Sequence, residues 1–228
     1  MPHPRPVRQE ILQPAGSSLP RYGALVATTR TPERLMFFTD GVTAIAVTLL
    51  ILPLVDVVTS SKEQGLTAPQ MITHHSAQIW TFLLSFVVIA RFWMVHHRLF
   101  EHVRSISTPL VVLNLAWLLM VVVLPFPTEV TGVYETSRFT SGLYVGAILL
   151  LALLQTAMVV LIHRTPALAE PDQPVPTSQV ASAVIMTGLF TIAFLLAVLV
   201  PAAGFYSLFV AFLAPVVSRV RTRWGLFV

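Results

Sequence analysis

Residues 34–53 read RLMFFTDGVTAIAVTLLILP and contain two charged side chains, those of Arg34 and Asp40. A helix of about 20 apolar residues spans the hydrocarbon core of a bilayer, and a charged side chain inside such a helix is costly. Asp40 lies well inside the apolar run. The stretch therefore predicts a membrane-spanning helix in which Asp40 needs either a polar partner or a function.

The rest of the chain has the composition of a protein that crosses a membrane several times. Of its 228 residues, 55% are hydrophobic and 11% are charged, whereas a soluble domain has about 25% charged residues. Its apolar runs lack the alternation of barrel strands, so they are expected to be helices. We predict an all-α, polytopic membrane protein with six transmembrane helices, at about residues 34–55, 74–100, 106–126, 138–163, 178–200 and 203–218.

The segments at the two ends fall outside this six-helix unit, which covers residues 31–218. Residues 1–30 are rich in Pro, Ser and Arg and are predicted to be a loose cytoplasmic tail. Residues 219–228 are predicted to be a second cytoplasmic tail. The Pro-rich residues 166–176 are expected to form a cytoplasmic linker between two of the helices.

The basic residues predict the orientation of the helices, because cytoplasmic loops carry an excess of Lys and Arg. With both termini cytoplasmic, 12 of the 14 basic residues lie inside, and Lys62 and Arg138 lie outside. The 12 are Arg5, Arg8, Arg21, Arg30, Arg34, Arg91, Arg98, Arg104, Arg164, Arg219, Arg221 and Arg223. Because they lie between apolar runs rather than on one polar surface, the net charge of +4 does not indicate a nucleic-acid partner.

The sequence lacks the residue patterns of common enzymes and metal sites. It has no cysteine, which excludes disulfides and thiolate ligands. It has no glycine-rich phosphate loop and no Gly-x-Ser-x-Gly motif. His97, Glu101 and His102 lie close in sequence but do not form a His-Glu-x-x-His pattern. We therefore expect no enzyme activity, no cofactor and no resident metal ion.

One face of the first predicted helix is a continuous stripe. At about 100° per residue, Ile45, Leu49 and Leu52 lie within about 60° of one another, and Thr48 lies on the flank of this stripe. Asp40 lies about 140° away from Ile45. The residues alone leave two interpretations open, a face that packs against another helix and the lining of an ion pathway.

Polar side chains in the next two predicted helices lie level with Asp40. Trp93 and His96 are near the predicted cytoplasmic end of the second helix, and Asn114 is in the third. Indole, imidazole and amide N–H groups can all donate to a carboxylate, so we predict a buried network around Asp40. Two alternatives stay open. Asp40 is an acid near a helix N-terminus or a partner of Arg34, or Asp40 and His96 form a titrating pair in a proton path.

Residues 34–40, with the pattern Arg-x-x-x-Phe-Thr-Asp, resemble the Arg-x-x-x-Phe-Ser-Asp signature that opens the first helix of the transmembrane protein 175 family of potassium channels. Thr39 stands where the family has Ser, and it keeps the hydroxyl. Further positions that look like the family pattern are Trp93, His96, Asn114 and residues 125–128. The resemblance covers about residues 34–128.

The resemblance implies a bacterial-type potassium channel subunit, a multi-pass protein of the bacterial plasma membrane that forms a homotetramer. In the family, the first helix lines the pore, and an apolar residue five positions after the signature aspartate forms the constriction. That position is Ile45, and the further pore layers fall at Thr48, Leu49 and Leu52. The residues implied to hold this helix to its neighbours are Arg34, Phe38, Thr39, Asp40, Trp93, His96 and Asn114.

The predicted activity is passage of K⁺ with modest preference over Na⁺, gated by dewetting of the apolar constriction at Ile45. The partners are then potassium ions and membrane lipid. One alternative is a proton leak or a proton-coupled transporter that uses Asp40 and His96. Another is an integral-membrane enzyme or an assembly subunit that moves no ion.

Overall fold

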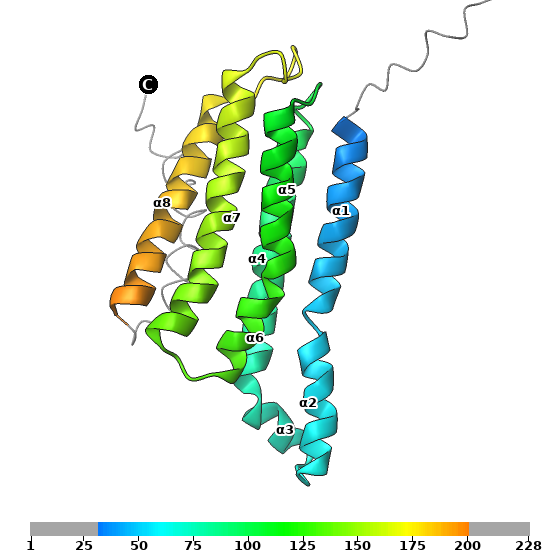
Figure 1. The fold of residues 1–228 in the computed structure, drawn as a ribbon, viewed down its shortest axis with the longest axis vertical. Coiled ribbons are helices and arrows are strands. Elements are labelled where there is room, and N and C mark those ends of the chain that lie inside the picture. Colours follow the sequence, from blue (N-terminus) through cyan, green and yellow to red (C-terminus); the bar gives the residue numbers. More distant parts are fainter. Residues whose placement is uncertain (1–31, 201–228) are drawn as a thin grey trace, which may run out of the picture.

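The computed structural model describes residues 32–200, which form a bundle of helices. In Figure 1, α1 (Pro32–Leu49) and α2 (Leu52–Glu63) lie on one side, α7 (Arg138–Arg164) and α8 (Thr177–Leu199) lie on the other, and α4 (Ser76–Phe100) and α5 (Thr108–Val123) lie between them. The predicted all-α fold class is confirmed. Within residues 32–200 there is no strand, only one isolated bridge between Val103 and Ala169.

A proline divides the first membrane-spanning stretch into α1 and α2. Pro53 has no N–H to donate to the carbonyl of Leu49, and its ring clashes with the preceding turn of a helix. Helix α1 accordingly ends at Leu49, and α2 begins at Leu52 with the proline in its first turn. The apolar stretch is therefore helical on both sides of a break.

Residues after the first predicted span continue as helix. Helix α2 ends at Glu63. The chain turns at Gly65, whose φ of 72° is favoured by glycine, and the N–H of Leu66 donates to the carbonyl of Ser61 at 3.0 Å. A short helix, α3 (Ala68–His74), follows, and Thr67 and Gln70 form its capping box. The chain then enters α4.

A second proline separates α5 from α6 (Pro125–Val133). Helix α6 packs against α4 and α7 and buries Thr128 and Thr131. Ser85 of α4 lies 2.7 Å from the hydroxyl of Thr128 and 2.8 Å from that of Tyr144 on α7. These three buried hydroxyls join α4, α6 and α7 where no water is available to satisfy them.

The interior of the bundle is centred on α5 and α7. Its fully buried side chains include Leu110 and Trp117 on α5, and Tyr144, Ile148 and Leu151 on α7. Helix α8 packs along α7, and the segment between them lies against the end of α4, where the N–H of Arg104 donates to the carbonyl of Leu168 at 2.8 Å. Across the bundle, α1 is followed by α4 and α5, which overlap in the view, and then by α7 and α8 (Figure 1).

Within residues 32–200, five helical stretches are long and apolar enough to cross a membrane: Pro32–Glu63, Ser76–Phe100, Thr108–Val133, Arg138–Arg164 and Thr177–Leu199. The first and third extend beyond the predicted ends at residues 55 and 126, because the chain becomes helical again after each proline, as α2 and α6. The predicted sixth helix at 203–218 and the predicted tails at 1–30 and 219–228 lie outside the described residues.

Replacing Gly132 by Ala is expected to destabilise the contact between α6 and α4. A Cβ atom at this position would lie 2.8 Å from Oγ1 of Thr81 and 3.1 Å from Cα of Gln78. Such overpacking costs about 1–3 kcal/mol. The thermal midpoint of the protein in detergent, followed by size-exclusion chromatography, should fall.

Gly188→Ala in α8 is the matched control, because nothing lies within 4 Å of the Cβ it would add. Alanine is favoured over glycine in a helix by about 1 kcal/mol, so this variant should be as stable as the wild type or more stable. Equal midpoints for the two variants would contradict the close approach of α6 and α4.

Candidate pore helix and its polar anchors

Helix α1 presents one face to the rest of the chain. Its buried residues are Thr39, Thr43 and Ala46, which recur at the spacing of a single helix face. This face packs against α4 and α5. The rotation of α1 about its axis is therefore determined by its side-chain contacts with α4 and α5.

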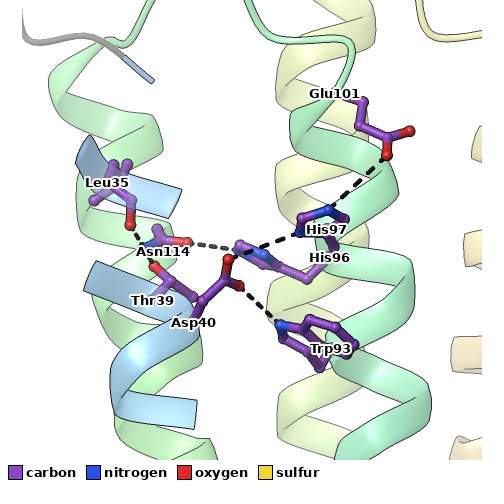
Figure 2. Close-up of polar contacts among 8 residues, drawn as sticks. All are labelled: Leu35, Thr39, Asp40, Trp93, His96, His97, Glu101 and Asn114. Atoms are coloured by element: carbon purple, nitrogen blue, oxygen red, sulfur yellow. Dashed lines mark hydrogen bonds and ion pairs between the residues drawn. The ribbon is translucent and has the colours of Figure 1, made fainter. Parts of the chain in front are cut away.

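Asp40 is held by α4. The indole N–H of Trp93 donates to Oδ1 of Asp40 at 2.8 Å. Nδ1 of His97 lies 3.9 Å from Oδ2 of the same carboxylate. Figure 2 shows the carboxylate between these two rings, one turn of α4 apart. The carboxylate of Asp40 on α1 thus accepts a hydrogen bond directly from Trp93 on α4. An unpaired carboxylate inside a membrane-spanning helix would be costly.

Thr39, the neighbour of Asp40, is held by α5. Nδ2 of Asn114 donates to Oγ1 of Thr39 at 2.9 Å, and that hydroxyl donates to the carbonyl of Leu35 at 2.9 Å. Oδ1 of Asn114 lies 2.6 Å from Nε2 of His96 (Figure 2). Because the amide oxygen can only accept, this contact places a proton on Nε2 of His96. The chain of bonds therefore runs from α4 through α5 to α1.

Aromatic rings enclose His96. Its imidazole stacks on the ring of Phe100 and on that of Trp117, with centroids 4.4 Å apart in each case. The side chain is buried, and its Nδ1 has no hydrogen-bond partner. His96 is therefore fixed in position by two rings and one hydrogen bond.

The opposite face of α1 is exposed on the single chain. The exposed fractions are 61% for Ile45 and 43% for Leu49, and Thr48 is exposed on the same face. Leu52, the fourth residue of the predicted stripe, is 54% exposed but lies beyond the break, at the start of α2. The hydroxyl of Thr48 donates to the carbonyl of Ile45 at 2.8 Å, which leaves its oxygen lone pairs available. The stripe identified in the sequence thus faces away from the rest of the chain.

The polar residues of the predicted network form two groups rather than one. Asp40 pairs with Trp93, whereas His96 pairs with Asn114 and not with Asp40. The reason is geometric, because residues three apart on a helix point about 60° from one another. The histidine that faces Asp40 is His97, four residues after Trp93 and therefore on the same side of α4. That spacing was visible in the sequence.

Two signature residues lie outside both groups. Arg34 and Phe38 are exposed on α1. No ion pair joins Arg34 to Asp40 among residues 32–200, where the ion pairs are those of His97 with Asp40 and with Glu101. The described residues also contain no group of three or more His, Asp or Glu side chains that could hold a metal ion.

These features define a class of protein: a helical multi-pass membrane protein whose first span is anchored by buried polar side chains and leaves an apolar stripe exposed. A family model described as endosomal/lysosomal potassium channel TMEM175 matches residues 34–125. A protein of Streptomyces collinus that is named as a potassium channel is 30% identical over 154 residues, which cover 64% of this chain and 71% of that protein. The chain belongs to the TMEM175 family, which is described as a family of channels.

Other relatives carry two different names. A potassium channel of Chamaesiphon minutus is 29% identical over 127 residues, which cover 53% of this chain and 60% of that protein. A Danio rerio protein named endosomal/lysosomal proton channel TMEM175 is 25% identical over 156 residues, which cover 68% of this chain and 29% of that longer protein.

The fold agrees with a solved structure of the family. The crystal structure of a lysosomal potassium-selective channel TMEM175 homologue from Chamaesiphon minutus superposes with a TM-score of 0.65 at 24% identity. The superposition covers 83% of this chain and 97% of that chain. The chain therefore has the fold of this channel family.

Trp93→Phe is expected to lower the free energy of unfolding by about 2 kcal/mol, because it removes a hydrogen bond to a charged group and leaves a partly buried carboxylate with one donor fewer. The thermal midpoint in detergent measures the effect. Trp80→Phe is the matched control, since Trp80 is also on α4 but is 69% exposed. If both variants melt at the wild-type temperature, the bond to Asp40 does not stabilise the bundle.

Proposed function

We propose that the chain is a subunit of a potassium channel in which α1 lines the ion pathway. The observation that carries this proposal is the exposed stripe of Ile45, Thr48 and Leu49, on the face of α1 opposite to the one held by α4 and α5. Leu52, exposed at the start of α2, is proposed to extend this stripe. The potassium channel names of the Streptomyces and Chamaesiphon relatives support it. We further propose that the membrane is the plasma membrane of a bacterium.

The proposed pore forms between copies of the chain. The stripe lies on the outside of one subunit, so several copies must bring their stripes together to enclose a path. The family resemblance implies four. Arg34 and Phe38, which are exposed on α1, are then proposed to contact an adjacent copy. In this assembly the polar anchors of Thr39 and Asp40 keep each stripe turned toward the axis.

The proposed gate is a ring of Ile45 side chains. An apolar constriction too narrow for water leaves a cation without its hydration shell, so conduction requires the ring to widen or rotate. No cofactor, resident metal or catalytic step has a place in this mechanism. Thr48, one turn further along α1, is proposed as the polar contact for K⁺, because its hydroxyl oxygen accepts while its proton is used within the helix.

Ile45→Asn is expected to raise K⁺ flux from liposomes that contain purified protein, because an amide at the constriction keeps it wetted. The measurement is K⁺ release under a K⁺ gradient, repeated with Na⁺. Ile192→Asn is the matched control, since Ile192 on α8 is similarly exposed but lies outside the stripe. A rise in flux with Ile192→Asn and none with Ile45→Asn would refute the assignment of α1 as the pore helix.

Thr48→Ala is expected to reduce the preference for K⁺ over Na⁺, because it removes the hydroxyl oxygen while leaving the apolar layers in place. The reversal potential under bi-ionic conditions measures this preference. Thr48→Ser, which keeps the hydroxyl, should retain the wild-type value. An unchanged reversal potential for Thr48→Ala would exclude Thr48 from ion selection.

Proton conduction is the second candidate function. The vertebrate relatives are named proton channels, and His97 lies between the carboxylates of Asp40 and Glu101, at 3.9 and 4.0 Å. This triad replaces the pair of Asp40 and His96 as the candidate path. Proton flux into the same liposomes under a pH gradient, lost in His97→Gln with K⁺ flux kept, would support it.

A further inference from the structure

A cavity of about 520 Å³ opens between α4, α7 and α8, on the side of α4 away from α1. Ligand-binding cavities in proteins have volumes of about 300–1,000 Å³. None of the polar anchors of α1 lines it. It is therefore separate from the proposed ion pathway.

The cavity has a polar end and an apolar end. Arg98 and His102 lie at the end of α4, and Ser178 and Ser182 lie at the beginning of α8, so these residues line the polar end. Further along, the walls are apolar, and the rings of Phe92 and Phe190 stack with centroids 5.8 Å apart. A ligand that fits this shape is itself polar at one end and apolar at the other.

The charges of the wall favour an anion. Arg91 and Arg98 lie on one side of α4, seven residues or about 10 Å apart along its axis. Neither arginine forms an ion pair within residues 32–200. Glu101 is the acidic residue of the lining. Its carboxylate lies 4.0 Å from Nε2 of His97, a residue that does not line the cavity. Both arginine side chains are exposed near the predicted cytoplasmic end of α4, so their guanidinium groups are accessible to an anion.

Two further groups lack partners in this region. Gln155 on α7 belongs to the lining and is buried, yet neither its amide nitrogen nor its amide oxygen has a hydrogen bond. Residues 91 and 155 each lie nine residues before the end of their helix, so they are at similar depth. Helix α8 begins at the polar end without a side-chain cap from Pro176, and the N–H of Gln179 donates to the carbonyl of Pro176 at 2.9 Å, so the N–H groups of Thr177 and Ser178 are the ones available to an anion.

We infer that this cavity binds an anionic phospholipid, with the phosphate between Arg98 and the first turn of α8 and an acyl chain against Phe92 and Phe190. A soluble anion does not explain the long apolar wall. The surrounding bilayer supplies the lipid.

Retention of lipid by the full chain tests this inference. Purified protein is equilibrated in detergent with equal amounts of dioleoyl phosphatidylglycerol and dioleoyl phosphatidylcholine, and the lipids that remain bound are counted by native mass spectrometry. The wild type should keep phosphatidylglycerol in preference. Arg91→Gln and Arg98→Gln should each weaken this binding about fivefold, the effect of one basic residue on binding to anionic lipid.

Arg104→Gln is the matched control, since Arg104 lies just beyond α4 but does not line the cavity. It should leave retention unchanged. A second pair of variants tests the apolar end: Ala183→Phe fills the cavity and should abolish retention, whereas Val184→Phe, on the exposed side of α8, should not. Gel filtration before the measurement restricts the comparison to folded protein.

Several outcomes would overturn the inference. The first is equal retention of the two lipids by the wild type. The second is a loss of phosphatidylglycerol that is as large for Arg104→Gln as for Arg98→Gln. The third is no retention of lipid by the wild type, which would mean that another part of the chain fills the cavity. Because binding is measured in detergent without ion flux, failure of the channel proposal would leave this result unaffected.

Discussion

In the hydrocarbon core of a membrane, a polar side chain finds no water, so its hydrogen bonds must come from the protein. This constraint sets the position of α1. Thr39 and Asp40 are adjacent in sequence but point about 100° apart around the helix, and they bond to different neighbours, Asn114 on α5 and Trp93 on α4. Two bonds in two directions fix both the depth and the rotation of α1, and so determine where the residues of its opposite face, such as Ile45, point.

The sequence was sufficient to predict the fold class, because long apolar runs in a bilayer have few alternatives to helices. It also predicted that Trp93 would bond to Asp40, but it did not include His97, the histidine that faces this carboxylate. It did not predict that His96 pairs with Asn114 instead, because depth along a helix can be counted from a sequence, whereas the side of the helix that faces a given neighbour depends on packing. Trp93 and His96 point about 60° apart, so one faces α1 and the other faces α5.

Helix α4 serves both sides of the bundle. Trp93 and His97 face α1, while Arg91 and Arg98 face the cavity beside α7 and α8. The predicted ends at residues 55 and 126 fall short of the observed ones, because the chain becomes helical again after Pro53 and Pro125, as α2 and α6. The sequence therefore identifies such a proline as a break but does not show whether the chain beyond it is helical.

The break at Pro53 has a mechanical consequence. In an unbroken helix, a bend in the first span would stretch a continuous ladder of main-chain hydrogen bonds. Here the bond that would join residue 53 to the carbonyl of Leu49 cannot form, so the span behaves as two stiff rods joined by a pivot at residues 50 and 51. The rod that carries Ile45 is clamped by α4 and α5. At the joint, the N–H of Ile51 donates to the carbonyl of Thr48 over a long distance of 3.4 Å, so the rod beyond Leu52 can swing at the cost of one weak main-chain bond.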